Sequence, residues 1–239
     1  MEPGPIQALP SPQTEPRQNP MPEASSKADE RDEANLPPKK IAYLTIDDGP
    51  SETVTPKILD ILQDEGVKAT FFVLPCEGVD HIYERILREG HAMGNHSYSH
   101  DYKRLYSAAD EGAFFRADIQ RAEAWLREKF DHETDLFRFP SGSKGWGTAV
   151  IARRREILAE LGYRVFDWDI SNGDTDPSSA SRDPEALAEN VMGRVNWPDQ
   201  LIVLMHDTGS KGTTADALPH IIAGLKAEGY VFDTLERYE

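Results

Sequence analysis

Short apolar runs alternate with longer amphipathic stretches from residue 41 to the end of the 239-residue chain. The runs have the length of strands and the stretches the length of helices. This alternation implies a mostly parallel sheet covered by helices, arranged either as a barrel or as an open doubly wound sheet. We expect strands at 41–46, 69–73, near 92, 136–139, 164–168, 201–205 and 230–232. We expect helices near 54–65, 79–89, 110–130, 148–161, 184–195 and 214–227.

Residues 1–40 differ in composition from the rest of the chain. They contain nine of the seventeen prolines and almost no large apolar residues. Such a segment cannot bury enough surface to offset the entropy that is lost on ordering. We therefore predict a disordered, partly extended Pro-rich linker at 1–40 and one α/β domain at 41–239, which is long enough for a substantial core.

The sequence shows no membrane segment, because no apolar run approaches the roughly 18 residues needed to cross a bilayer. The N-terminus also lacks the charged and apolar regions of a signal peptide. A linker that begins directly after Met1 suggests either that an upstream signal or anchor was removed or that the protein is naturally cytosolic.

The net charge of −16 argues against nucleic acid as a partner, because nucleic-acid binding needs basic patches. The run Arg153–Arg155 is short, and we expect it on the solvated face of a helix. Cys76 is the single cysteine, which excludes an internal disulfide and a cysteine-based zinc site. We expect it to be a small buried side chain.

Polar clusters lie at or just after the ends of the predicted strands. In barrels and in open parallel sheets, functional sites gather at the carboxyl ends of the strands. We therefore expect residues that are far apart in the sequence to meet at one edge of the sheet. The clusters are Asp47-Asp48, His96–His100, Arg138, Trp168-Asp169 and His206-Asp207.

Asp47 and Asp48 end the first predicted strand and are followed by Gly49 and Pro50. Adjacent side chains of a strand point to opposite faces, but past the strand end both carboxylates can converge on one site. One could hold a cation while the other remains free to take a proton. Alternatively, the same four residues form an ordinary turn, because aspartate, glycine and proline are all common in turns.

His96 and His100 are four residues apart, so on a helical turn they would share one face. Two imidazoles and one carboxylate form a three-ligand set that leaves positions open for water and substrate, as a catalytic zinc site requires. An isolated pair at this spacing is usually structural. The two carboxylates after another strand favour the metal-site interpretation.

His206 and Arg138 are the other candidates for chemistry. A histidine at a strand end can act as a general acid near neutral pH, although a hydrogen-bonded core histidine is the alternative. Arg138 lies between Phe137 and Phe139 and is expected to be half buried. A buried arginine needs a carboxylate partner, which a free aspartate at the site or a salt bridge elsewhere could supply.

Five segments of this chain, in order, resemble the motifs of the NodB-homology polysaccharide deacetylases, carbohydrate esterase family 4. The resemblance runs from residue 41 to about 235 and is specific because the segments follow one another in the family's order. Ile46 stands where phenylalanine is common, and Ser141 replaces a frequent tyrosine. The segments are Thr45–Pro50, His96–His100, Arg138–Gly142, Asp167–Asp174, which matches in part, and Leu204–Asp207.

The resemblance implies an irregular (β/α) barrel with fewer than eight complete units. It also implies that Asp48, His96 and His100 bind a divalent metal, usually Zn²⁺, with Co²⁺, Ni²⁺ or Mn²⁺ as alternatives. Asp47 would be the general base and His206 the general acid.

The same resemblance assigns residues around the reacting group. Arg138 would orient the base, and the backbone N–H of Ser141 would help to hold the oxyanion. Leu204 would border the acetyl methyl group, and Pro140 and Trp168 would belong to the substrate-binding wall. Trp146 is a further candidate for this wall, and core packing is the alternative for Trp168.

The fourth segment departs from the family pattern of two aspartates followed by tryptophan. Ser171 stands near the first acidic position, and Thr175 stands where the tryptophan would be. The residue that tunes the pKa of His206 is therefore either Asp174 or Asp169.

The resemblance implies a metal-dependent enzyme that removes N-acetyl groups from N-acetylglucosamine units of a polysaccharide. Peptidoglycan is the first expectation, and chitin oligomers or acetylated xylan at the same site are alternatives. A non-catalytic glycan-binding domain is a further alternative, whereas a phosphatase with Asp47 as nucleophile is disfavoured because Gly49 stands where its second acid would be. We expect a monomer that is extracellular or associated with the cell wall, with a cytoplasmic location as the alternative.

Overall fold

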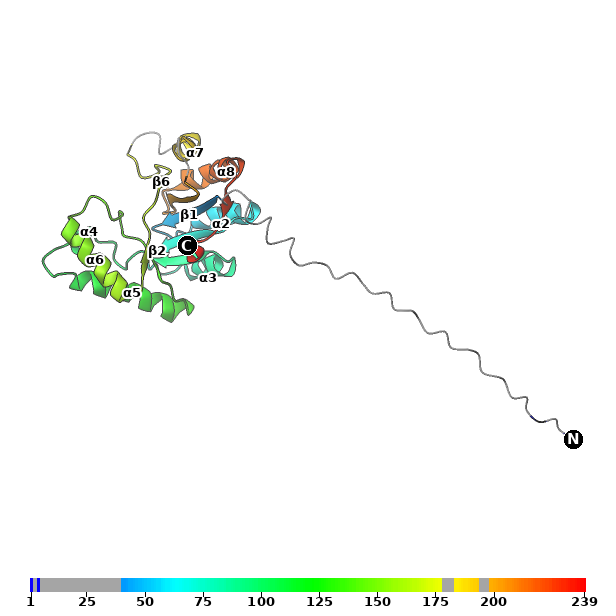
Figure 1. Cartoon of the computed structure of the whole chain (residues 1–239), viewed down its shortest axis with the longest axis horizontal. Coiled ribbons are helices and arrows are strands. Elements are labelled where there is room, and N and C mark those ends of the chain that lie inside the picture. Colours follow the sequence, from blue (N-terminus) through cyan, green and yellow to red (C-terminus); the bar gives the residue numbers. More distant parts are fainter. Residues whose placement is uncertain (2–3, 5–39, 178–182, 194–197) are drawn as a thin grey trace, which may run out of the picture. The chain divides into compact units, whose positions relative to one another are not determined.

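The computed structural model describes residues 1, 4, 40–177, 183–193 and 198–239. The chain divides into one unit up to Pro37 and a second at Pro38–Glu239. The predicted linker at 1–40 lies almost entirely outside the described residues, so it stays a prediction. The structure described below is that of the second unit (Figure 1).

The centre of this unit is a sheet in which every pairing is parallel. The strands run in the order β5-β4-β3-β2-β1-β7-β6, and β8 pairs with β1. The sheet is a curled half-barrel covered by helices, which confirms the expected α/β fold class. The strands are β1 (Ile41–Asp47), β2 (Ala69–Val73), β3 (Ala92–Asn95), β4 (Leu136–Phe137), β5 (Arg164–Val165), β6 (Ile170–Ser171), β7 (Gln200–His206) and β8 (Val231–Phe232).

The six predicted helices are present, with ends that move by a few residues. In Figure 1, α4, α5 and α6 are grouped on one side of the sheet, and α7 and α8 lie together elsewhere. The helices are α2 (Thr55–Asp64), α3 (Asp80–Arg88), α4 (Tyr102–Leu105), α5 (Ala113–Phe130), α6 (Thr148–Glu160), α7 (Pro184–Met192), α8 (Gly212–Ala227) and the short 3₁₀ helix η3 (Leu235–Arg237). The sequence did not predict α4, β6 or η3.

Strand periodicity separates the structural face of the sheet from the functional one. In β1, Leu44 and Ile46 enter the largest core cluster, which is shared with α2 and α8, whereas Tyr43 belongs to a different cluster. Because alternate side chains share a face, Thr45 and Asp47 lie on the same side as Tyr43. In β7 the same alternation places Val203 in the main core, and Leu204 and His206 on the functional side.

The structure corrects several local expectations. Arg154 is only 1% exposed, so the run Arg153–Arg155 is not a wholly solvated face. Its guanidinium is buried because Nε donates to the carbonyl oxygen of Leu105 at 2.9 Å and Nη2 to that of Ser107 at 2.5 Å. Cys76 is exposed rather than buried, because it lies in the loop between β2 and α3.

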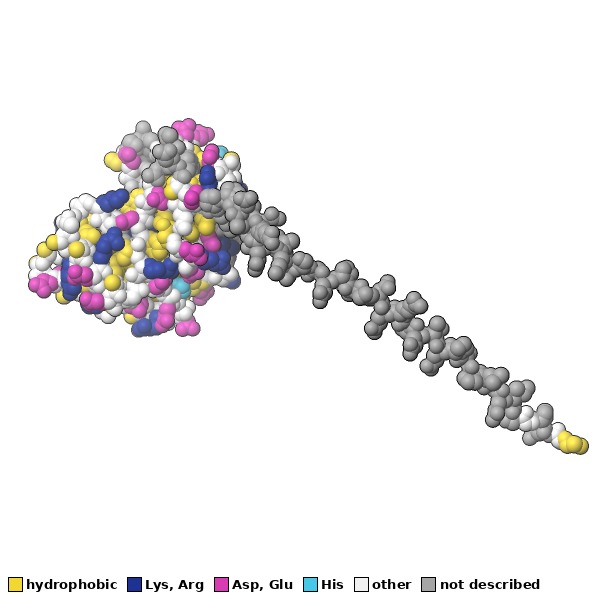
Figure 2. Space-filling model, in the orientation of Figure 1, with side chains coloured by type: hydrophobic (Ala, Val, Ile, Leu, Met, Phe, Trp, Pro, Cys, Tyr) yellow, Lys and Arg dark blue, Asp and Glu magenta, His cyan; other side chains and the backbone are white. Residues whose placement is uncertain are grey.

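None of the described helices has the length and apolar character needed to span a membrane. On the face drawn in Figure 2, acidic and basic side chains are interspersed over the described residues, with no continuous basic patch.

Candidate active site

A cavity of about 240 Å³ lies at the carboxyl ends of the strands. Residues from six separate segments line it, so the predicted convergence of distant polar clusters is present in the structure. The lining residues are Asp47, Asp48, His96, His100, Tyr102, Ser141, Trp168, Thr175, Leu204 and His206.

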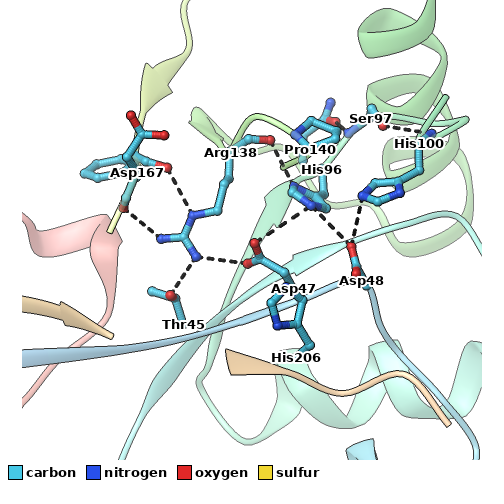
Figure 3. A network of polar contacts seen from close by, with 12 residues as sticks. Thr45, Asp47, Asp48, His96, Ser97, His100, Arg138, Pro140, Asp167 and His206 are labelled. Atoms are coloured by element: carbon cyan, nitrogen blue, oxygen red, sulfur yellow. Dashed lines mark hydrogen bonds and ion pairs between the residues drawn. The ribbon is translucent and has the colours of Figure 1, made fainter. Parts of the chain in front are cut away.

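Asp48, His96 and His100 bring their potential ligand atoms within 4.8 Å of one another. The Nε2 atoms of His96 and His100 lie 3.3 Å and 3.1 Å from the same oxygen of Asp48. Figure 3 shows the three side chains pointing toward one another from two different loops. One carboxylate and two imidazoles with open positions form a donor set that suits Zn²⁺ and related divalent ions.

The hydrogen bonds of His96 leave its outward nitrogen available to a metal. Nδ1 lies 2.9 Å from the backbone carbonyl oxygen of Arg138. Because a carbonyl oxygen can only accept, Nδ1 carries a proton, and Nε2, which faces Asp48, is the ring nitrogen that can bind a metal once its own proton is lost. In metal sites a ligating histidine usually donates a hydrogen bond from its second ring N–H to a carbonyl or carboxylate oxygen, as His96 does here.

The two histidines do not share a helical face, contrary to the expectation from their spacing. They lie in the loop after β3, where Ser97 has a φ of 75° and His100 a φ of 51°. The side chain of Asn95 accepts a hydrogen bond from Ser97 N at 2.8 Å, and Ser97 Oγ accepts one from His100 N at 3.1 Å. Side-chain bonds to the backbone therefore bring the imidazoles together.

The two histidines also change the acidity of Asp48. Burial alone would raise the pKa of Asp48, but hydrogen bonds and charge from His100 and His96 outweigh burial and lower it strongly. The carboxylate is thus held in the ionised form that a metal ligand requires.

Asp47 is paired with Arg138 beside the cluster of Asp48, His96 and His100. Nη1 of Arg138 donates to Asp47 Oδ1 at 2.9 Å and to Thr45 Oγ1 at 2.6 Å. The guanidinium also donates to the backbone carbonyl oxygens of Phe166 and Asp167, at 3.0 Å and 3.1 Å. Arg138 is 0% exposed, so the expectation of half burial was wrong. It lies just past β4 and inside the curled sheet, where these four acceptors hold one rotamer.

His206 is paired with Asp174. In Figure 3 the ring of His206 is drawn below Asp47, whereas Arg138 is drawn above it. Nδ1 of His206 lies 2.8 Å from Asp174 Oδ1, while Asp174 Oδ2 accepts from the backbone N–H of His206 and from Thr214 Oγ1. Burial alone would lower the pKa of His206, but the hydrogen bond and charge of Asp174 outweigh burial and raise it. Asp169 instead accepts from Ile202 N at 2.8 Å, so of the two candidates Asp174 contacts the histidine.

The predicted substrate-binding residues are only partly in the cavity. Ser141, Leu204 and Trp168 line it, and Ser141 has a φ of 65°. Pro140 is buried beside the site and is absent from the lining; its carbonyl oxygen accepts from Tyr106 at 2.6 Å. Trp146 stacks on Tyr106, with ring centroids 4.1 Å apart, and is also outside the lining.

Sequence reasoning missed Tyr102 as a cavity residue. Its ring is 39% exposed and packs edge-on against His100, with centroids 4.8 Å apart. Asp101 caps the short helix that carries it, by accepting from the N–H groups of Lys103 and Arg104. An aspartate followed by an aromatic residue directly after His100, a candidate metal ligand, was the available signal.

Comparison with known proteins gives consistent results. The family model described as polysaccharide deacetylase matches residues 34–166. Two proteins of Bacillus cereus named peptidoglycan-N-acetylglucosamine deacetylase are 34% and 32% identical to this chain; the matches cover 80% and 82% of the chain and 66% and 87% of those proteins. The structure of a CE4 esterase from Streptococcus mutans is 33% identical, with a TM-score of 0.75 over 82% of this chain and 86% of that one.

Proposed function

The chain belongs to the polysaccharide deacetylase family, and we propose that it removes acetyl groups from N-acetylglucosamine units of peptidoglycan with the help of a divalent metal ion. One observation carries the proposal. Three metal-ligating side chains, a carboxylate held by a buried arginine and a histidine held by a second carboxylate line the same cavity.

In the proposed reaction Asp47 acts as the general base and His206 as the general acid. Asp48, His96 and His100 would hold a divalent ion, which would lower the pKa of a bound water molecule and polarise the amide carbonyl. Asp47 accepts a proton from the water molecule as the oxygen of the water bonds to the carbonyl carbon. The backbone N–H of Ser141 stabilises the negative charge that develops on the carbonyl oxygen.

His206 completes the reaction by donating a proton to the sugar nitrogen. The C–N bond then breaks, and acetate and a free amine are released. An amine leaves poorly without that proton, so a histidine whose pKa is raised by Asp174 suits an amide substrate. An alkoxide leaving group depends less on such an acid, which favours N-deacetylation over the acetylxylan esterase alternative.

Arg138 supports the base. Its contact with Asp47 at 2.9 Å holds Oδ1 and leaves Oδ2 as the oxygen that can accept a proton. Tyr102 and Trp168 present aromatic rings to the cavity, against which the apolar faces of a sugar can pack. The names of the relatives support peptidoglycan as the polymer, with chitin oligomers as the nearest alternative. We propose a location at the cell wall because that is where peptidoglycan lies.

A panel of substrates tests the proposal. The full chain, loaded with zinc, is incubated with peptidoglycan fragments, chitin oligomers and acetylated xylan, and acetate release is followed together with product masses. We expect deacetylated peptidoglycan fragments, and none with Asp47→Asn, which retains the three metal ligands. Release of acetate from acetylated xylan alone would show that the enzyme is an esterase and not an N-deacetylase. Binding of glycans without any release of acetate would indicate a glycan-binding domain.

A further inference from the structure

Asp207 is a buried carboxyl group behind the site and takes no part in the reaction described above. It is 0% exposed, and its Oδ1 has no hydrogen-bond partner among the described residues. Burial raises the pKa of this carboxyl to about 7. A buried carboxyl with an unpaired oxygen costs stability, so its presence calls for a reason other than packing.

The hydrogen bonds of Asp207 join three parts of the site. Its Oδ2 accepts from Thr55 Oγ1 at 2.5 Å, and Thr55 Oγ1 accepts in turn from Ser51 N at 2.7 Å. Ser51 Oγ donates to the backbone carbonyl of Asp207 at 2.6 Å and accepts from Val54 N at 3.1 Å. The end of β7 is thereby tied to the start of α2 and to the turn that follows β1.

The carboxyl group also lies directly against that turn. A Cβ atom placed on Gly49 would be 2.1 Å from Asp207 Oδ1 and 2.3 Å from Oδ2, so only glycine allows this approach. The neighbouring Asp48 has a φ of 76°, a left-handed conformation that costs free energy for a residue other than glycine. Surrounding contacts must therefore hold Asp48 in place. On one side, Asp48 N donates to the carbonyl oxygen of Phe72 at 3.2 Å and the carbonyl oxygen of Gly49 accepts from Leu74 N at 2.9 Å. On the other side, the carboxyl group of Asp207 lies against Gly49, and Thr55 Oγ1 accepts from Ser51 N.

We propose that Asp207, acting through Thr55 and the Gly49 turn, is a positioning residue that presents Asp48 to the metal ion. The inference rests on the proposed function, because Asp48 must be a metal ligand for it to hold. Its physical basis is that a ligand carboxylate binds best when its backbone is already in the binding conformation. Outer-shell contacts of this kind are generally worth about 10–100-fold in metal affinity.

Metal affinity of the full chain tests this inference without any need for activity. Zinc dissociation constants are measured by competition with a chromophoric chelator for the wild type, Asp207→Ala, Thr55→Val and Thr55→Ser. We expect Asp207→Ala and Thr55→Val to bind zinc about 10–100-fold more weakly. Thr55→Ser keeps the hydroxyl group and is expected to retain the wild-type affinity.

Thr70→Val is the matched control. Thr70 is also 0% exposed and its hydroxyl accepts from Leu235 N at 2.9 Å, away from the turn. Thr70→Val removes a buried hydroxyl group that accepts from a backbone N–H, as Thr55→Val does, but no bond to Asp207. It should therefore lower the melting temperature and leave zinc affinity unchanged. If Thr55→Val bound zinc as tightly as the wild type, or if Thr70→Val lost as much zinc affinity as Thr55→Val, this inference would be overturned and the proposed function would be unaffected. Failure of the wild type to bind a divalent metal would instead overturn the proposed function, and the inference with it.

Discussion

Replacing Asp174 by asparagine should change how catalysis depends on pH. The carboxylate of Asp174 lies 2.8 Å from Nδ1 of His206 and raises the pKa of the imidazole. The raised pKa keeps the general acid protonated above the ordinary histidine value of about 6.5. An asparagine of the same shape removes the charge, so the pKa of His206 falls and the alkaline limb of the kcat profile moves to lower pH.

The magnitude follows from the strength of the lost interaction. A hydrogen bond to a charged group is worth about 1.5–3 kcal/mol. Since each 1.36 kcal/mol corresponds to about a tenfold change in the protonated fraction, kcat at alkaline pH should fall about 10–100-fold. At a pH below both pKa values His206 is protonated in either protein, so the two kcat values should approach each other there.

The assay is acetate release under saturating substrate across a range of pH, with the zinc content of each sample verified. Asp169→Asn is the matched control: Asp169 lies in the same segment but bonds to Ile202 N, so its profile should match that of the wild type. A uniform loss of kcat at every pH in Asp174→Asn would refute the electrostatic argument and leave only a steric role for Asp174.

Three further perturbations test other parts of the structure. Removal of metal by a strong chelator should abolish acetate release, which added zinc should restore in the wild type but not in Asp48→Asn at the same concentration. Arg138→Met leaves the carboxylate of Asp47 buried without its partner, and urea unfolding should show a loss of about 3–5 kcal/mol. Arg154→Ala should lower the free energy of unfolding by about 3 kcal/mol, because two buried carbonyl groups lose their donor. Arg153→Ala should change it by less than about 0.5 kcal/mol. Equal melting temperatures for these two variants would contradict the burial argument.

Much of the fold could be predicted because the central strands are buried on both faces, against helices on one face and inside the curled sheet on the other. Such strands read as continuous apolar runs, and β2 was predicted with the bounds that the structure has. The strands β4, β5 and β6 have two residues each, and β6 exists because Ile170 and Ser171 pair with β7. A pairing of that kind leaves no periodic pattern in the local sequence.

Burial of individual side chains was less predictable than the elements that carry them. Arg154 is in the predicted helix, but its burial depends on acceptors almost fifty residues earlier in the chain. The choice between Asp169 and Asp174 had the same origin. It depends on contacts more than thirty residues later in the chain, where Asp174 meets Nδ1 of His206 and Asp169 accepts from Ile202 N.

The adjacent acids Asp47 and Asp48 show how one dipeptide provides two separate functions. Asp47 is the last residue of β1, and strand alternation directs it to the same face as Thr45 and Arg138. Continued alternation would direct Asp48 away from that face, but its φ of 76° breaks the strand geometry, and its carboxylate lines the cavity. Aspartate and asparagine are among the few residues besides glycine that tolerate this conformation. The variant Asp48→Asn should therefore keep the backbone conformation and lose the negative charge of the ligand. We expect it to fail to bind zinc while its melting temperature stays near that of the metal-free wild type. That result would identify the missing charge, rather than misfolding, as the cause.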